Sequence, residues 1–446
     1  MGYVMSFDKD FIFGVATSAG QIEGGAKDDG RGESIWDVFS AKPGKINNGD
    51  TPAVACDSYH KFDRDLQNLR FLGVNGYRMS ISWSRVMPDG KGALNQAGVD
   101  YYKRCFDALL EAGIKPNVTL YHWDLPQALE DKNGWVNRDT IKYFAEYADK
   151  MFSLYGDIIP LWSTINEPIA TYVGYALGGF APGRINEKEG NQARHNILVA
   201  HGAAVDAFRA SGAKGDIGIV IDIWKRHALR DTEEDIAIMT DQDERNWKFY
   251  TDPVLGGRYS DYLLSHLASE GTLMDIYDGD LELTHRPIDF YGLNVYNRVP
   301  VTADKKTEAD FSQGGNFLNN KTEYYPKAIY DAIHLVHDLY KLQIPIYITE
   351  NGTYFIGEEK RGSDGMIEDD DRVKYIFGFL SWLEKAIDEG FDVRGYFLWS
   401  LMDNFEWTAG YNYKFGIFET DFDTLVTRPK KSALWYKDFI KKVKEK

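Results

Sequence analysis

Two glutamates, Glu167 and Glu350, each follow a short apolar segment and stand next to an asparagine. Two carboxyl groups that face one another can cleave a glycosidic bond, because one protonates the leaving oxygen while the other acts at the anomeric carbon. A buried, ion-paired glutamate would look the same in a sequence, so neither residue decides the question alone. The pair, with Trp, Asn, Gln and His residues close to strand ends, favours carbohydrate chemistry.

Other polar and aromatic side chains also stand where predicted strands end. Amides, imidazoles and carboxylates hydrogen-bond hydroxyl groups, and aromatic rings pack on the apolar faces of sugar rings. The candidates are Gln21, Glu23, Arg78, Trp83, His122, Trp123, Asp124, Asn166, Asp222, Trp224, Asn294, Tyr296, Asn351, Trp399, Asp403, Asn404, Glu406 and Trp407.

His122 on its own favours a hydrogen-bonded core imidazole, and a metal ligand is the alternative. Its neighbours Trp123 and Asp124 do not give metal-ligand spacing, and no second histidine lies close by in the sequence. No Ser-His-Asp arrangement stands out, and there is no G-x-S-x-G motif. We therefore expect neither a metal nor another cofactor.

Bringing many strand ends together requires a particular scaffold. Short apolar runs, typical of strands buried on both faces, alternate along the chain with amphipathic segments of helical period. The predicted strands are Phe11–Ala19, Val74–Trp83, Ile114–Trp123, Ile159–Asn166, Asp216–Trp224, Ile288–Tyr296, Ile344–Glu350 and Val393–Leu401. The predicted helices are Cys56–Leu72, Ala97–Ala112, Asp139–Tyr155, Gln192–Ser211, Lys327–Leu342, Asp370–Glu389 and Ser432–Lys444.

This alternation, without a break in composition, predicts a (β/α)8 TIM barrel in one catalytic domain spanning residues 1–446. Lys27–Ala55 and Val301–Tyr325 are expected to be extended loops over the C-terminal face of the strands. Lys225–Pro287 should hold several short helices. A doubly wound sheet is the rival fold, but no Gly-rich phosphate loop follows the first strand.

Composition narrows the classes of partner. The formal net charge of −17 repels nucleic acid and anionic lipid, so we expect a neutral small-molecule substrate. The two cysteines, Cys56 and Cys105, are expected to be buried free thiols, which fits a reducing compartment. With no signal-peptide pattern and no run of about 18 apolar residues, a cytoplasmic protein is predicted. Nothing indicates the oligomeric state.

Three segments resemble the signature motifs of glycoside hydrolase family 1. They are Thr164-Ile165-Asn166-Glu167-Pro168, Ile348-Thr349-Glu350-Asn351-Gly352, and Phe13–Ser18 with Gln21–Gly24. The agreement continues through Tyr77-Arg78, Ser80–Trp83, Tyr121–Pro126, Trp399–Leu401, Asp403–Trp407 and Arg428–Lys430. It covers essentially the whole chain.

The resemblance implies a retaining mechanism, with Glu167 as acid/base and Glu350 as nucleophile, their carboxyl groups about 5–5.5 Å apart. It implies that Arg78 and Tyr296 keep the nucleophile ionised and oriented. It also implies a set of substrate-binding residues: Gln21, His122, Trp123, Asn166, Asn294, Tyr296, Trp399, Glu406, Trp407 and Phe415.

The implied activity is that of an exo-acting β-glucosidase releasing glucose from cellobiose, short oligosaccharides and aryl or alkyl β-glucosides, with side activity on β-galactosides and β-fucosides. A 6-phospho-β-glycosidase is the alternative, but such members of the family carry Ser where Glu406 stands, and a carboxylate would repel the phosphate. A non-catalytic sugar-binding barrel would be expected to lack Glu167 or Glu350. A glycanase acting on long polymers is a further alternative.

The chain departs from the family pattern on the side expected to bind the aglycone. Gly20 stands where an aromatic is usual, Ile169 where many members have Trp, and Phe180 where many have His. Lys321-Thr322-Glu323-Tyr324 replaces the usual Gly-Trp stretch. The preferred aglycone therefore stays open.

Overall fold

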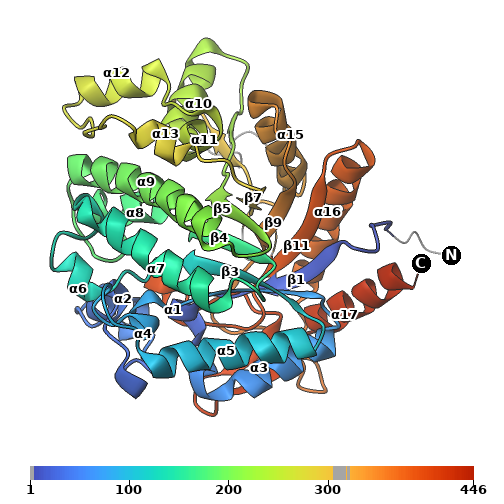
Figure 1. Ribbon diagram of the computed structural model, residues 1–446. Helices are drawn as coiled ribbons and strands as arrows, with labels where there is room; N and C mark the ends of the chain where they lie inside the picture. The colour runs from blue at the N-terminus through green and yellow to red at the C-terminus, as the bar shows by residue number, and fades with distance from the viewer. Residues whose placement is uncertain (1–4, 305–317, 319–321, 446) are drawn as a thin grey trace.

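The computed structural model describes residues 5–304, 318 and 322–445, and its centre is a closed barrel of parallel strands (Figure 1). The barrel order is β1-β11-β9-β7-β5-β4-β3-β2. The strands are β1 (Ile12–Ala16), β2 (Gly76–Ser80), β3 (Lys115–Tyr121), β4 (Leu161–Asn166), β5 (Asp216–Asp222), β7 (Phe290–Asn294), β9 (Ile346–Asn351) and β11 (Val393–Trp399). The predicted (β/α)8 barrel is confirmed.

The predicted strands extend too far at most of their C-terminal ends. The expected strand Val74–Trp83 leaves the sheet after Ser80, and the short helix α4 (Trp83–Val86) begins at its last residue. Similar short helices follow other barrel strands: α1 (Ala19–Ile22), α6 (Gln127–Glu130) and α8 (Ile169–Tyr175). The chain leaves regular pairing at the barrel mouth, where the polar strand-end residues gather.

Long helices pack around the barrel (Figure 1). They are α3 (Ser58–Leu72), α5 (Gln96–Glu111), α7 (Asp139–Tyr155), α9 (Glu187–Ser211), α15 (Ala328–Tyr340), α16 (Asp370–Asp388) and α17 (Lys431–Lys444). Each overlaps a predicted helix. α9 starts earlier than expected because the Asn186 side chain accepts a hydrogen bond from the Glu189 amide at 3.2 Å and caps it. α3 ends at Gly73, whose φ of 70° suits glycine.

Between β5 and β7 lie the short helices expected for Lys225–Pro287, gathered on one side of the barrel (Figure 1). They are α10 (Glu233–Arg245), α11 (Trp247–Gly256), α12 (Asp261–Ser269) and α13 (Asp280–Thr284). Three small two-stranded sheets were not predicted, because strands this short show no clear alternation: β6 (Arg226–Ala228) with β8 (Val299–Val301), β10 (Phe355–Ile356) with β12 (Tyr413–Lys414), and β13 (Phe418–Asp421) with β14 (Val426–Pro429).

A separate apolar cluster contributed by barrel strands includes Ile12, Leu161, Phe290 and Phe397. The Phe397 ring has room only because residue 14 on the neighbouring strand β1 is glycine, since a Cβ on Gly14 would lie 2.5 Å from the ring. Filling the barrel with side chains makes it a rigid core rather than a pore, so the strand ends are held in fixed positions.

The loop at Lys27–Ala55 packs on the C-terminal side of the barrel, as expected. It contains α2 (Ile35–Ser40), whose first turn is fixed by a capping box between Ser34 and Asp37. The Ile35 amide donates to the Leu125 carbonyl at 2.8 Å, just beyond β3. The second expected loop, Val301–Tyr325, lies in part outside the described residues.

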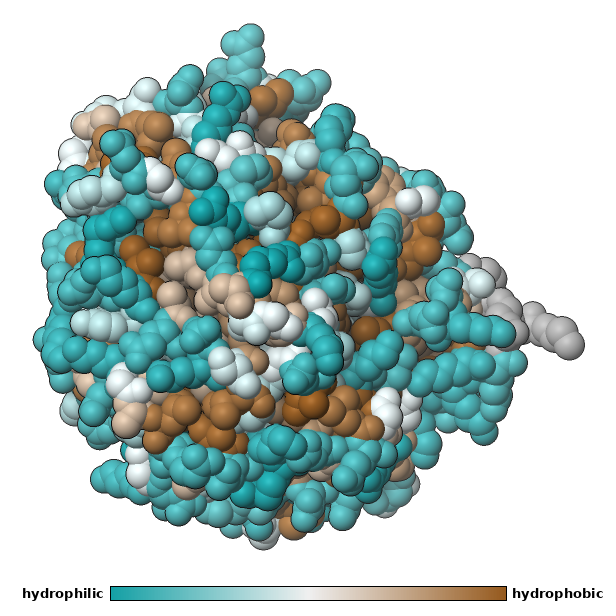
Figure 2. Space-filling model, viewed as in Figure 1, coloured by the Kyte–Doolittle hydropathy of each residue, from teal (hydrophilic) through white to brown (hydrophobic). Residues whose placement is uncertain are grey.

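Both cysteines are buried free thiols, as expected. On the face shown in Figure 2, hydrophilic residues cover most of the surface, with hydrophobic residues visible between them. Within the described part of the chain, no helix combines the length and apolar character needed to cross a membrane.

Candidate active site

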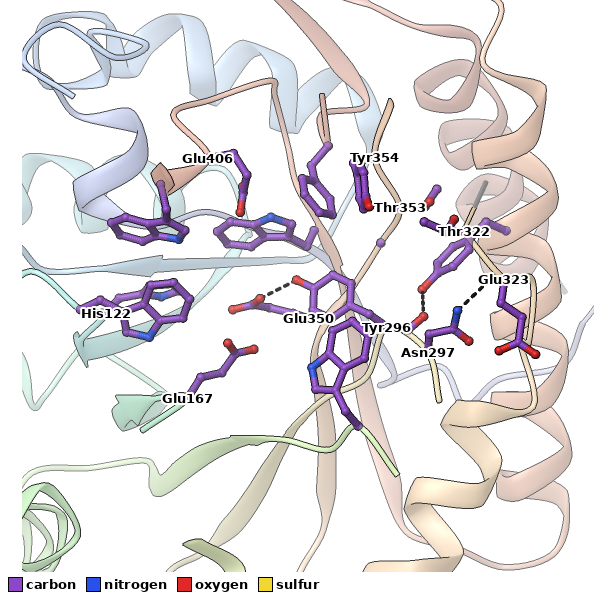
Figure 3. Close-up of a pocket in the computed structure, with 17 residues that line it drawn as sticks. His122, Glu167, Tyr296, Asn297, Thr322, Glu323, Glu350, Thr353, Tyr354 and Glu406 are labelled. Carbon is purple, nitrogen blue, oxygen red and sulfur yellow. Dashed lines mark hydrogen bonds between the residues drawn. The ribbon is translucent and has the colours of Figure 1, made fainter. Parts of the chain in front are cut away.

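A pocket of about 300 Å³ opens at the C-terminal ends of the barrel strands, and both strand-end glutamates line it (Figure 3). The predicted residues on its wall are His122, Trp123, Glu167, Tyr296, Glu350, Trp399, Glu406, Trp407 and Phe415. Four other predicted residues, Gln21, Arg78, Asn166 and Asn294, are buried behind the wall and hydrogen-bond to wall residues.

Glu350, near the end of β9, is held by a cation and a phenol. Arg78 Nη1 donates to Oε1 at 2.5 Å, and the Tyr296 hydroxyl donates to Oε2 at 2.6 Å. Burial, and then the nearby Glu350 charge, raise the pKa of Tyr296 well above its ordinary value, so the phenol keeps its proton and remains a donor. Both carboxylate oxygens are therefore fixed, and the negative charge is compensated.

Glu167, directly after β4, lies in a different environment. Asn294 Nδ2 donates to its Oε1 at 2.6 Å, and no cation pairs with it among the described residues. Burial, followed by the charges of Asp222 and Glu350, raises the pKa of Glu167 well above that of an ordinary glutamate. Its backbone has a φ of 45°, which is uncommon for a non-glycine residue. The surroundings of Glu167 therefore favour its protonated form.

Asn166 joins the two glutamates through a network of hydrogen bonds. Its Oδ1 accepts from Arg78 Nη2 at 2.6 Å and from Asn294 Nδ2 at 3.2 Å, while its Nδ2 lies 3.2 Å from His122 Nε2. Burial, and then the Arg78 charge, lower the pKa of His122 well below the ordinary value, so the imidazole is neutral. Its Nε2 can then accept from Asn166, which leaves Nδ1 as a proton donor with no partner among the described residues.

Gln21 and Glu406 form a second polar group at the pocket. Gln21 Nε2 lies 3.2 Å from Glu406 Oε2 and 3.0 Å from the Phe405 carbonyl oxygen. Burial, and then the Glu350 charge, raise the pKa of Glu406 to about 8. No group of three or more metal-ligating side chains occurs in residues 5–304, 318 and 322–445.

Aromatic rings make up much of the wall. His122 stacks with Trp399 at a ring-centroid distance of 5.9 Å, and the Trp123 and Trp407 rings lie 4.8 Å apart. Trp123 and Trp407 have φ values of 77° and 47°, so the chain is held in an unfavourable conformation to aim both indoles. Such a surface suits the apolar faces of a sugar.

The residues that depart from the family pattern lie at different places relative to the pocket. A Cβ on Gly20 would lie 3.4 Å from the Trp407 ring, so Trp407 occupies the space next to Gly20. Phe180 packs behind Trp123, with ring centroids 5.4 Å apart, and neither it nor Ile169 lines the pocket. Thr322 does line it, whereas Lys321 lies outside the described residues.

Trp224, a strand-end candidate from the sequence that was given no specific role, also lines the pocket, and it stacks on Tyr296 with ring centroids 5.9 Å apart. Several other wall residues were not singled out as binding residues from the sequence: Asn297, Glu323, Gly352, Thr353, Tyr354 and Tyr375. Tyr354 stacks on Tyr413 at 4.5 Å, across the β10–β12 sheet that the sequence did not reveal.

Comparison with known proteins agrees with this geometry. The family model for glycosyl hydrolase family 1 matches residues 3–445. Beta-glucosidase A of Acetivibrio thermocellus is 43% identical over 444 residues, covering 98% of each chain. A bifunctional beta-D-glucosidase/beta-D-fucosidase of Bifidobacterium breve is 38% identical over 460 residues, also with 98% of each chain covered. A solved structure of the Thermotoga maritima beta-glucosidase in complex with glucoimidazole superposes with a TM-score of 0.92 at 39% identity, covering 98% of this chain and 99% of that one.

Fold and site thus define a barrel glycosidase with two carboxyl groups in one sugar-sized pocket. The chain belongs to glycosyl hydrolase family 1.

Proposed function

We propose that the protein is a retaining, exo-acting β-glucosidase in which Glu167 is the acid/base and Glu350 the nucleophile. The observation that carries this assignment is the contrast between their environments. Glu350 has a guanidinium and a phenol on its two oxygens, whereas burial and neighbouring carboxylates raise the pKa of Glu167. Two carboxyl groups whose surroundings differ in this way can act as a proton donor and a charged nucleophile at the same pH.

In the first step, a Glu350 oxygen attacks the anomeric carbon while the bond to the leaving oxygen breaks and Glu167 gives that oxygen its proton. Arg78 and Tyr296 keep the attacking carboxylate in place through bonds of 2.5 and 2.6 Å. The products are the free aglycone alcohol and a glycosyl ester of Glu350. Glu167 is then ionised and ready to act as a base.

In the second step, Glu167 takes a proton from a water molecule whose oxygen attacks the anomeric carbon, and the ester bond to Glu350 breaks. Two inversions give net retention of the β configuration. The mechanism predicts that the two carboxyl groups lie about 5–5.5 Å apart, closer than the 6.5–9.5 Å needed when a water molecule must fit between them.

The sugar is proposed to be an unphosphorylated glucose unit bound by the polar residues of the pocket. The Asn166–His122 pair and the Gln21–Glu406 pair supply amide, imidazole and carboxyl groups for its hydroxyls, and Trp399 and Trp407 supply apolar surface. The Bifidobacterium breve relative supports a side activity on β-fucosides. Glu406 in the pocket disfavours the alternative, a 6-phospho-β-glycosidase, because its charged form would repel phosphate.

Broad tolerance of the aglycone, including cellobiose from cellulose breakdown, is a further part of the proposal. It rests on the pocket wall beyond the glutamates, where Thr322 and Glu323 stand in the segment that departs from the family pattern. We also propose that residues 1–446 form one catalytic domain, in keeping with the family match over residues 3–445. A cytoplasmic location is proposed from the two buried free thiols.

The test is hydrolysis of nitrophenyl β-glucoside, β-galactoside, β-fucoside and 6-phospho-β-glucoside by the intact protein, with the first-formed sugar anomer followed by NMR. We expect the β-glucoside to be among the best substrates and β-glucose to appear before α-glucose. A preference for the phosphorylated substrate, or α-glucose as the first product, would overturn the proposal.

A further inference from the structure

Asp222 is a third carboxylate at the barrel mouth, and the reaction described above gives it no part. It ends β5, which lies between β4 and β7 in the barrel. The residue is only 5% exposed, and its Oδ1 finds no hydrogen-bond partner among the described residues. A buried carboxylate without full hydrogen bonding is unfavourable, so its presence beside the site calls for an explanation.

The strand register places Asp222 beside Asn294, the residue that hydrogen-bonds Glu167. The Cα of Asp222 is paired with that of Asn294 on β7, and Asn294 donates the 2.6 Å hydrogen bond to Glu167. On the other side, the backbone amide of Glu167 donates to the Val220 carbonyl at 2.9 Å. Val220 and Asp222 point to the same face of β5, because side chains alternate along a strand. Adjacent strands are about 4.8 Å apart, so Asp222 lies beside the residue that hydrogen-bonds the Glu167 carboxyl group and near the Glu167 backbone.

Two buried carboxylates near one another oppose each other's ionisation. Burial raises the pKa of Asp222 to about 7, and the Asp222 charge in turn helps to raise the pKa of Glu167. The negative charge of an ionised Asp222 therefore makes the loss of the Glu167 proton harder. The other charged or titratable groups around the pair are Glu350 on β9, Arg78 on β2, Tyr296 after β7, Tyr291 on β7, Arg226 on β6, Tyr250 on α11 and Asp243 on α10.

We propose that Asp222 is a positioning residue for the catalytic proton, whose negative charge keeps Glu167 protonated until the glycosidic bond breaks. The same charge makes ionised Glu167 a stronger base towards water in the second step. This inference rests on the proposed role of Glu167 as acid/base.

The experiment measures kcat/KM against pH for the wild type, Asp222→Asn, Asp222→Ser and Asp243→Asn. Two substrates are compared: cellobiose, whose leaving oxygen needs a proton, and 2,4-dinitrophenyl β-glucoside, whose leaving group does not. Asp243→Asn is the matched control, because Asp243 is a buried aspartate of the same region that is not among the causes of the Glu167 shift.

Removing the Asp222 charge should lower the pKa of Glu167. For cellobiose, the fall of kcat/KM at alkaline pH should then begin at a pH lower by about one unit, as expected for the loss of one nearby like charge. The alkaline limb should stay in place in Asp243→Asn, and the dinitrophenyl profile should not move in any variant. Asp222→Ser provides the same test if Asp222→Asn does not fold. If the wild type is active but neither Asp222 variant moves the alkaline limb of the cellobiose pH profile, this inference is wrong, whereas the proposed function stands. A wild type that hydrolyses neither glucoside overturns the proposed function as well.

Discussion

Replacing Glu167 with glycine should separate substrates by their leaving groups. The change removes the carboxyl group that accepts the Asn294 hydrogen bond, but the Arg78 and Tyr296 bonds to Glu350 stay in place. The nucleophile should therefore still attack, without help from an acid. General acid catalysis contributes about 10²–10⁴-fold, which corresponds to about 3–5 kcal/mol of transition-state stabilisation.

The assay compares kcat/KM of the wild type and Glu167→Gly on cellobiose and on 2,4-dinitrophenyl β-glucoside. The loss should be about 10²–10⁴-fold on cellobiose and small on the dinitrophenyl substrate, because dinitrophenolate leaves without protonation. Steady-state turnover of the dinitrophenyl substrate should still fall, because the second step lacks its base, and a burst of dinitrophenolate should precede it. Equal losses in kcat/KM on both substrates would refute the role assigned to Glu167.

Three further outcomes are expected. Tyr296→Phe should lower kcat by about 10–100-fold, because a hydrogen bond to a charged group contributes about 1.5–3 kcal/mol; an unchanged kcat would show that the 2.6 Å bond to Glu350 is not used. The preference for glucoside over 6-phosphoglucoside should grow as the pH rises through about 8, where Glu406 gains its charge. Glu406→Ser should lower glucoside activity and make this preference less dependent on pH. A preference independent of pH in the wild type would count against repulsion by Glu406. Activity should survive exhaustive chelation, because two carboxyl groups suffice for the reaction; a loss restored by one specific metal would contradict this.

The barrel could be predicted because its strands are apolar on both faces and recur between amphipathic segments. Ile346–Asn351 is such a strand, buried throughout. The exact points where strands end could not be predicted, since Ile81 and Trp83 continue the alternation of apolar residues after Ser80 although the chain has already left the sheet. Two-residue strands such as Phe355–Ile356 carry too little pattern to be recognised.

The pocket could be predicted where the residue stands at a strand end, because the barrel brings all such ends together. Glu167, Glu350 and His122 were found in this way and share one wall. Loop residues were harder, because their direction depends on backbone angles that the sequence does not show. Phe180, near an expected aglycone position, packs behind Trp123 instead.

The central claim is that Glu350 forms the covalent bond to the sugar and Glu167 moves the proton. The most direct test adds azide to Glu167→Gly and to Glu350→Gly with an activated β-glucoside and identifies the azide products by NMR. In Glu167→Gly, azide should attack the glycosyl ester of Glu350 without needing a base and give the β-azide. In Glu350→Gly, azide should attack the substrate directly and give the α-azide, while hydrolysis without azide is abolished. The same azide anomer from both variants would contradict the assignment.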